Sequence, residues 1–236
     1  MKKKKIKIIK SQYLGNIVVP NTDNGKKKNF YDLFAFHELS LFAKYIQLKN
    51  KFKYALDVGA NLGLHTIILC RLGYKVKSFE ADPSTFRKLQ RNLKKNLCKN
   101  YTIYNLAISD FNGRSKFYQI TDNLTANTLE NTSKQVYGKY KTINVNVKTI
   151  NKFLPNSNTL IKLDVEGAEY NILKSINFSR SDTKCSPSAS TVKPLIVIVP
   201  IVRSPVPSMV VAPAIEPTAV KPWLLNSAPA ECTDLA

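Results

Sequence analysis

Acidic residues beside a glycine-punctuated turn are the first candidates for chemistry in this chain of 236 residues. Asp57 ends a short apolar run, 54–58, and the turn that follows carries Gly59, Asn61 and Gly63 before an apolar helical segment. A strand, a tight loop and a helix start in this order bind a nucleotide-like ligand at the carboxyl end of a parallel strand. Glycine allows unusual backbone angles and a close approach to a ligand. We therefore expect Asp57 and the turn residues to form a cofactor site.

A second acid, Glu80, follows at the end of an alternating segment, 75–80, and lies 80 − 57 = 23 residues beyond Asp57. Dinucleotide-binding folds place a ribose-binding acid about 20 residues beyond the glycine loop. The glycines here have the spacing G-x-x-x-G rather than G-x-G-x-x-G. This difference favours S-adenosylmethionine over NAD as the cofactor, because the former has no pyrophosphate to bind.

Four segments, in this order, resemble the FkbM family of S-adenosylmethionine-dependent methyltransferases: 57–66 (DVGANLGLHT), 79–83 (FEADP), 105–113 (NLAISDFNG) and 161–174 (IKLDVEGAEYNILK). The resemblance covers roughly residues 31–178, with Ala81 where the family has Pro. It implies a class I, Rossmann-like α/β fold, which is a doubly wound, mostly parallel sheet with helices on both faces. It also implies methyl transfer, usually to a hydroxyl oxygen of a sugar, a lipid-linked glycan or a natural product.

The resemblance also implies roles for residues beyond the first two strands. Asn105 and Asp110 follow the third strand, where class I enzymes contact the adenine. Asp164, Glu166 and Glu169 end the fourth strand and are expected to serve the substrate or the active site. The alternative for the two glutamates is that they lie in the first turn of a helix and stabilise its positive end.

The expected chemistry is an in-line methyl displacement, in which the protein mainly holds the acceptor oxygen close to the sulfonium. Asp164 is the best candidate for a general base, because a hydroxyl of high pKa benefits from one. A divalent metal held by Asp164 and Glu166 is an alternative, although nothing in the spacing demands a metal. His65 and His37 are expected to be packed, structural side chains.

The elements that must position these residues alternate between strand and helix, which is typical of a parallel α/β sheet. Alternation in 115–120 and 142–148 indicates an added antiparallel pair, and the polar span between them, 121–141, reads as a loop or lid. The expected strands are 54–58, 75–80, 101–105 and 160–164, and the expected helices are 63–72, 84–96 and 167–175.

Lysine dominates the charge of the chain, which carries 36 Lys and Arg against 16 Asp and Glu and a formal net charge of +20. Such a balance attracts nucleic acid, anionic lipid or phosphorylated substrates, so an RNA methyltransferase is an alternative. Only six of the basic residues are Arg, the residue on which base and phosphate readout usually depends. We therefore expect a small-molecule or glycan hydroxyl, rather than RNA, as the acceptor.

Neither a membrane span nor a secretion signal is indicated. No stretch reaches the roughly 18 apolar residues that a spanning helix needs, and the residues after Lys2–Lys5 lack a continuous apolar run and a cleavage site. The cysteines have no C-x-x-C spacing, so the sequence supports neither a zinc site nor a disulfide framework. A cytoplasmic location is the expectation.

A change of composition after residue 178 divides the chain. Nine of the twelve prolines and the single Trp lie in 179–236. We expect an N-terminal basic extension (1–30), a methyltransferase domain (31–178) and a Pro-, Ala- and Ser-rich tail (179–236). Our hypothesis is that a frameshift or fusion produced this tail, which leaves the C-terminal strands missing or replaced. A truncated, non-catalytic protein is therefore an alternative. Residues 194–202 (PLIVIVPIV) resemble a fifth strand that Pro200 interrupts.

Overall fold

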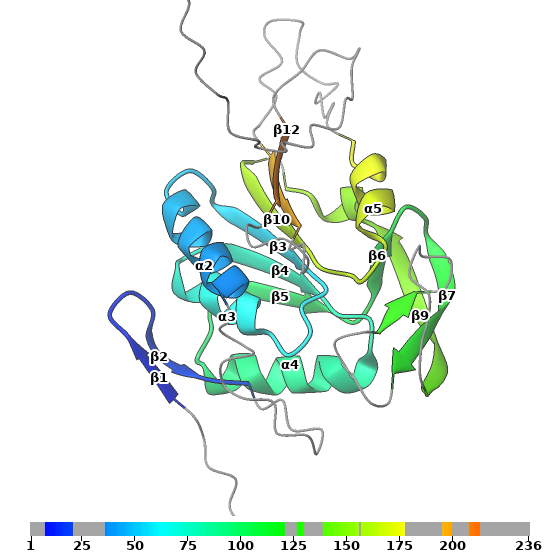
Figure 1. Cartoon of the computed structure of the whole chain (residues 1–236), viewed down its shortest axis with the longest axis horizontal. Coiled ribbons are helices and arrows are strands. Elements are labelled where there is room, and N and C mark those ends of the chain that lie inside the picture. The colour runs from blue at the N-terminus through cyan, green and yellow to red at the C-terminus, as the bar shows by residue number, and fades with distance from the viewer. Residues whose placement is uncertain are drawn as a thin grey trace, which may run out of the picture.

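A six-stranded sheet forms the centre of the computed structural model, which describes residues 8–20, 36–120, 127–129, 139–155, 157–177, 195–199 and 208–212 (Figure 1). Neighbouring strands in this sheet are parallel, except for the antiparallel pair β11–β12 at one edge. The strand order is β12 (Ser208–Ala212), β11 (Leu195–Val199), β10 (Thr159–Leu163), β3 (Tyr54–Val58), β4 (Lys75–Phe79) and β5 (Tyr101–Tyr104). The predicted doubly wound α/β fold is confirmed.

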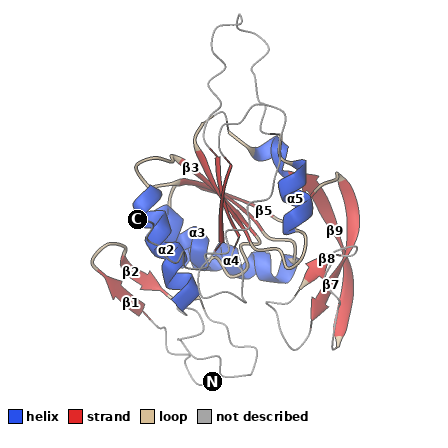
Figure 2. Ribbon diagram, turned by 45° about the horizontal axis from the view of Figure 1, so that its top comes forward, coloured by secondary structure: helices blue, strands red, loops and turns tan. Residues whose placement is uncertain are grey.

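Helices cover both faces of the central sheet (Figure 2). On one face lie α2 (Phe36–Leu48), α3 (Leu64–Arg71) and α4 (Pro83–Lys95), whose buried apolar residues pack with Ala55, Val76 and Leu160 of the strands. On the other face lies α5 (Glu169–Ser175), whose Ile172 packs with Leu56 and Ile161. Because side chains alternate along each strand, the two apolar cores form on opposite faces of the same strands.

Local signals explain where α4 begins. Asp82 is its N-cap, and the Asp82 Oδ1 accepts a hydrogen bond from the Ser84 N–H at 2.8 Å. Pro83 occupies the first helical position, where its missing N–H costs nothing. Leu89 and Leu93 are fully buried one turn apart.

A second, four-stranded sheet lies beside the central one, in the order β6 (Ala107–Ser109), β9 (Tyr140–Thr149), β7 (Gly113–Ile120) and β8 (Thr128–Leu129). β7 and β9 form the predicted antiparallel pair. Within the span 121–141 that was expected to be a loop or lid, residues 128–129 form β8, whereas 121–126 and 130–138 lie outside the described residues. A 3-10 helix, Ile150–Phe153, leads back to the central sheet.

Part of the N-terminal extension packs onto the domain. The antiparallel strands β1 (Ile8–Ser11) and β2 (Gly15–Val18) form a hairpin. Ile17 of this hairpin is buried in the core beside α2 and α3. The Asn96 side chain accepts a hydrogen bond from the Val18 N–H at 2.8 Å and donates one to the Val18 carbonyl at 2.9 Å. The hairpin is thus attached at the end of α4.

The central sheet continues beyond residue 178. β11 pairs in parallel with β10, with Thr159 opposite Leu195, and β12 pairs antiparallel with β11. Two strands therefore lie where the sequence led us to expect missing or replaced ones. The described part of β11 ends at Val199, and the predicted interruption at Pro200 lies outside the described residues. Residues 178–194, 200–207 and 213–236 lie outside the described residues, so our hypothesis about the origin of the tail stays a prediction.

Candidate functional site

The strand order reverses between β3 and β10. β4 and β5 extend the sheet on one side of β3, whereas β10 and β11 extend it on the other. In open α/β sheets, ligands bind in the crevice outside the carboxyl ends of the strands at such a switch point. Asp57 lies near the carboxyl end of β3, and Asp164 directly follows β10. The two predicted acids therefore lie at the expected edge of the sheet.

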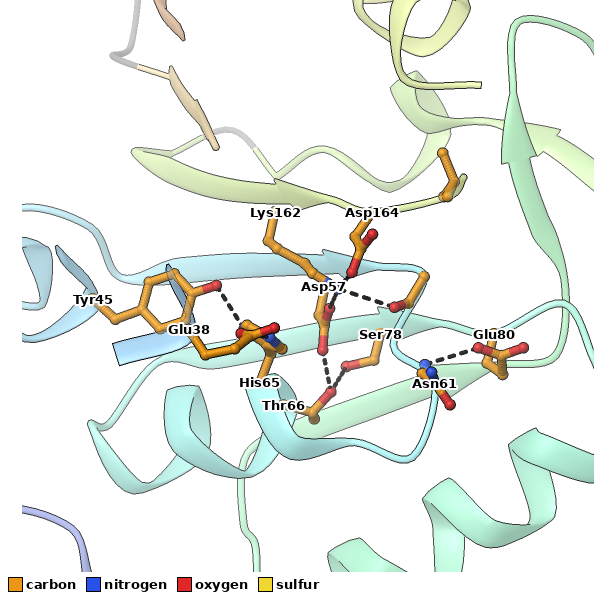
Figure 3. Close-up of polar contacts among 12 residues, drawn as sticks. Glu38, Tyr45, Asp57, Asn61, His65, Thr66, Ser78, Glu80, Lys162 and Asp164 are labelled. Carbon is orange, nitrogen blue, oxygen red and sulfur yellow. Dashed lines mark hydrogen bonds and ion pairs between the residues drawn. The ribbon is translucent and has the colours of Figure 1, made fainter. Parts of the chain in front are cut away.

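Three polar side chains form a row across this edge, on the face that α3 covers. Lys162 lies opposite Asp57 in the register of β10 and β3, and Asp57 lies opposite Ser78 in the register of β3 and β4. Asp57 is fully buried, and its Oδ2 accepts a hydrogen bond from the Thr66 hydroxyl at 2.6 Å (Figure 3). The Thr66 and Ser78 hydroxyls are 2.8 Å apart. Asp57 is thus fixed from α3 and from a neighbouring strand.

Lys162 connects the two loops at the switch point. Its ammonium donates a hydrogen bond to the Gly59 carbonyl at 3.0 Å and lies 3.3 Å from Asp57 Oδ1 and 3.4 Å from Asp164 Oδ2 (Figure 3). The sequence interpretation gave this residue no role. The signal that would have revealed it is a single lysine inside a buried parallel strand, where near-continuous apolar residues are the rule.

The glycines of the turn serve two different purposes. Gly59 has a φ of +78°, and a Cβ placed on it would lie 1.9 Å from the Asp164 carbonyl oxygen. Gly63 has a φ of +92°, and its Cβ would lie 2.5 Å from Leu89 Cδ1 in α4. Gly59 therefore lets the two loops approach each other, whereas Gly63 makes room for a helix. A contact between Gly63 and the cofactor stays a prediction.

Glu80 orders the same turn from the neighbouring strand. Its Oε2 accepts a hydrogen bond from the Asn61 N–H at 2.8 Å, and its Oε1 accepts one from the Asp82 N–H at 2.9 Å. Burial raises the pKa of Glu80 to about 7, although these two N–H groups act in the opposite direction. Each carboxylate oxygen has a second lone pair, so Glu80 retains the capacity to accept a hydrogen bond from a ligand.

Asn105 and Asp110 lie apart from this row. The Asn105 amide donates hydrogen bonds to the carbonyls of Glu80 and Ala81, at 2.9 and 3.1 Å, and so holds the chain beyond β4. Asp110 is exposed after β6, and its Oδ1 accepts a hydrogen bond from the Ser109 hydroxyl at 3.1 Å. Their contacts with adenine remain predictions.

The two glutamates after β10 differ in position. The helix that we expected from residue 167 begins at Glu169, so Glu166 lies outside its first turn, with a φ of +57°. The Glu169 carboxylate accepts hydrogen bonds from the Val165 and Gly167 N–H groups, at 2.8 and 2.9 Å. It therefore shapes the loop beside Asp164. The Glu166 carbonyl accepts a hydrogen bond from the Thr128 hydroxyl at 2.8 Å, which attaches this loop to β8.

His65 is a packed side chain, as expected. Its Nδ1 is 3.0 Å from the Tyr45 hydroxyl, its Nε2 is 2.8 Å from Glu38 Oε2, and its ring packs against Phe42. Sequence reasoning missed Glu38 and Tyr45, which α2 brings to the site (Figure 3). The side chain of His37 lies outside the part that the structure describes.

A parallel sheet with a switch point, a glycine turn after its first strand and an acid at the end of the next strand define a class I, Rossmann-like domain. The methyltransferase FkbM domain matches residues 57–199, which is more than half of the chain. The protein therefore belongs to the FkbM methyltransferase family. The match ends at the last residue of β11, beyond residue 178, where the sequence resemblance was expected to end.

Similar proteins include other methyltransferases. The chain is 40% identical over 76 residues to the ribosomal protein L11 methyltransferase of Campylobacter fetus, and the match covers 32% of this chain and 27% of that protein. The chain thus matches about a quarter of the length of that relative.

Within the described residues, no helix is long and apolar enough to cross a membrane.

Two solved structures show a more distant likeness. The tRNA (uracil-54, C5)-methyltransferase of Pyrococcus abyssi, in complex with S-adenosyl-L-homocysteine, is 13% identical, with a TM-score of 0.38 over 81% of this chain and 34% of that one. The precorrin-6y C5,15-methyltransferase of Geobacter metallireducens is 13% identical, with a TM-score of 0.36 over 75% of this chain and 69% of that one. Such distant likenesses do not identify the acceptor.

Proposed function

We propose that the chain binds S-adenosylmethionine at the carboxyl ends of β3 and β10 and transfers its methyl group to a hydroxyl oxygen. The carrying observation is the charge at this edge of the sheet. The carboxylates of Asp57 and Asp164 lie 3.3 and 3.4 Å from the single ammonium of Lys162. Because these carboxylates outnumber the ammonium, the edge favours a cationic ligand, and S-adenosylmethionine carries both a sulfonium and an ammonium.

The residues at this edge fit such a ligand. Asp57 Oδ1 is buried and accepts no hydrogen bond within the described part of the chain. Glu80 retains lone pairs for the ribose hydroxyls. Asn61 and Gly59 shape the turn between these two acids, and the adenine would lie toward Asn105 and Asp110. These assignments are proposals for the donor site.

Methyl transfer needs an acceptor held in line with the sulfonium, and the bound S-adenosylmethionine supplies the electrophilic methyl group. Asp164 is the candidate general base, because its side chain is 39% exposed and its Oδ2 is held 3.4 Å from the Lys162 ammonium. It would take the hydroxyl proton as the acceptor oxygen attacks. Glu166 lies two residues further along the same loop and is proposed to orient the acceptor. The proposed acceptor is a sugar, a glycan or a natural product.

Calorimetric titration of the chain with S-adenosylmethionine tests the donor site. We expect each chain to bind one molecule of S-adenosylmethionine saturably. The Asp57→Asn variant should bind it more weakly, because the amide lacks the negative charge of the carboxylate. Gly73→Ala, whose Cβ would meet nothing within 4 Å, is the matched control for a change elsewhere in the fold. A folded chain that binds no S-adenosylmethionine would refute the donor site and favour the non-catalytic alternative.

RNA is the second candidate acceptor, and α4 is the observation that favours it. This helix carries five basic residues and no acidic one: Arg87, Lys88, Arg91, Lys94 and Lys95. A surface of this kind neutralises phosphates and releases counterions, so RNA affinity would fall steeply with added salt. Methylation of RNA, rather than of a glycan mixture, by the protein and labelled S-adenosylmethionine would select this alternative.

A further inference from the structure

Lys162 is buried at a position where a charge is costly. Its side chain is 2% exposed, in the middle of a strand whose other residues are all buried. An ammonium has three N–H donors, and three oxygens face it: the Gly59 carbonyl at 3.0 Å, Asp57 Oδ1 at 3.3 Å and Asp164 Oδ2 at 3.4 Å. The partners come from β3, from the turn after it and from the loop after β10, so one side chain joins the donor turn to the candidate base.

The surroundings keep this lysine charged. Burial lowers the pKa of Lys162, but the carboxylates of Asp57 and Asp164, with a further contribution from Glu38, outweigh burial and raise it. Asp57 depends on the lysine in return. Its buried Oδ1 accepts no hydrogen bond of good geometry within the described residues, so the Lys162 ammonium, 3.3 Å away, is the charge that balances it. A buried charge without a partner is strongly unfavourable, so each group requires the other.

We propose that Lys162 is the charge-balancing and positioning residue of the donor site. It fixes the Gly59 carbonyl and the Asp164 carboxylate relative to each other, and it sets how negative the site is. The inference rests on the proposed function. Its consequence is that Lys162 determines how strongly the site prefers S-adenosylmethionine, with its sulfonium charge, over the product S-adenosylhomocysteine, whose thioether sulfur is neutral.

Lys162→Met tests this, because methionine is similar in length and has no charge. Both compounds are titrated calorimetrically against the wild type and the variant, in two buffers of different ionisation enthalpy. We expect the ratio of S-adenosylmethionine affinity to S-adenosylhomocysteine affinity to rise about tenfold, because the carboxylates lose their ammonium. If a carboxylate of the variant takes up a proton instead, binding of S-adenosylmethionine will release that proton. The apparent binding enthalpy will then differ between the two buffers.

Thr66→Val is the matched control. It removes a hydrogen bond to the same Asp57 carboxylate without changing any charge. A purely structural disturbance weakens the binding of both compounds alike. This variant is therefore expected to keep the wild-type affinity ratio and the wild-type number of protons released on binding. Lys162→Arg keeps the charge and should also stay near the wild-type ratio.

An unchanged affinity ratio together with an unchanged proton count in folded Lys162→Met would overturn the inference. If Lys162→Met does not fold, the double variant Lys162→Met/Asp57→Asn removes the ion pair as a whole and should recover cooperative unfolding. A double variant that stays unfolded would also overturn it. A wild-type chain that binds neither compound refutes the proposed function instead, so the two failures are distinguishable.

Discussion

Gly59 lies directly against the backbone of Asp164, so these two residues join the two loops of the site. A Cβ on Gly59 would lie 1.9 Å from the Asp164 carbonyl oxygen, and the Asp164 N–H donates a hydrogen bond to the Val58 carbonyl at 3.0 Å. The turn after β3 and the loop after β10 are therefore in backbone contact. Any side chain at position 59 must separate them.

Gly59→Ala is expected to lower the free energy of unfolding by about 3 kcal/mol or more, from left-handed strain together with overpacking. Gly73→Ala is a strain-matched control, because Gly73 has a φ of +91° and its Cβ would meet nothing within 4 Å. That variant should lose only about 1–2 kcal/mol. Denaturant unfolding of both variants measures the difference, and equal losses would show that the contact with Asp164 is unimportant.

Asp164→Asn is expected to reduce methyl transfer at least about 100-fold, because the amide cannot take the acceptor proton. Affinity for S-adenosylmethionine should change far less, since Asp57 and the turn remain. Single-turnover transfer of a labelled methyl group gives the rate, and calorimetry gives the affinity. A loss of less than about tenfold in rate would exclude Asp164 as the base.

Glu80 makes stability depend on pH. Burial raises its pKa to about 7 from an ordinary value of 4.5, so the folded chain holds this proton more tightly than the unfolded chain. The stability that it contributes is therefore lost as the pH rises from about 4.5 to 7. The unfolding free energy of the wild type minus that of Glu80→Gln should fall by on the order of 2–3 kcal/mol across this range. Urea unfolding at several pH values measures it, and a constant difference would contradict the assignment.

Glu169→Ala is expected to lower the free energy of unfolding by about 1–3 kcal/mol, because the Val165 and Gly167 N–H groups lose their carboxylate acceptor. Tyr170→Ala, next in sequence and 72% exposed, should change it by less than about 0.5 kcal/mol. Thermal and urea unfolding compare the two. A fully stable Glu169→Ala that has lost methyl transfer would instead assign Glu169 to the chemistry.

The elements around the site followed from local sequence. The apolar run 54–58 is β3 as predicted, and the predicted strand 160–164 is β10 displaced by one residue. Apolar runs ended by glycine or acid define such elements because the period of the side chains and the turn residues are local properties. The antiparallel pair β7–β9 followed from alternation in the same way.

The contacts that bring β1–β2 and α2 to the domain could not be derived in this way. Ile17 is buried by segments distant in sequence, and Val18 is held by Asn96, which is 78 residues away. Glu38 and Tyr45 meet His65 only because α2 packs beside α3. No local pattern encodes such partners, since burial there depends on how separate elements pack.

By itself, the sequence determined the order of strands and helices, the glycine turn and the acids at the strand ends, because propensity and periodicity act over a few residues. Tertiary structure decided which of these residues meet. Lys162 reaches the Gly59 carbonyl across 103 positions of sequence, and only the parallel register of β3 and β10 brings them together. The same register decided that Gly59 lies against Asp164, whereas the packing of α4 decided that Gly63 makes room for Leu89. Charge balance at the site is a property of that register, because buried charges are stabilised only by the partners that the fold supplies.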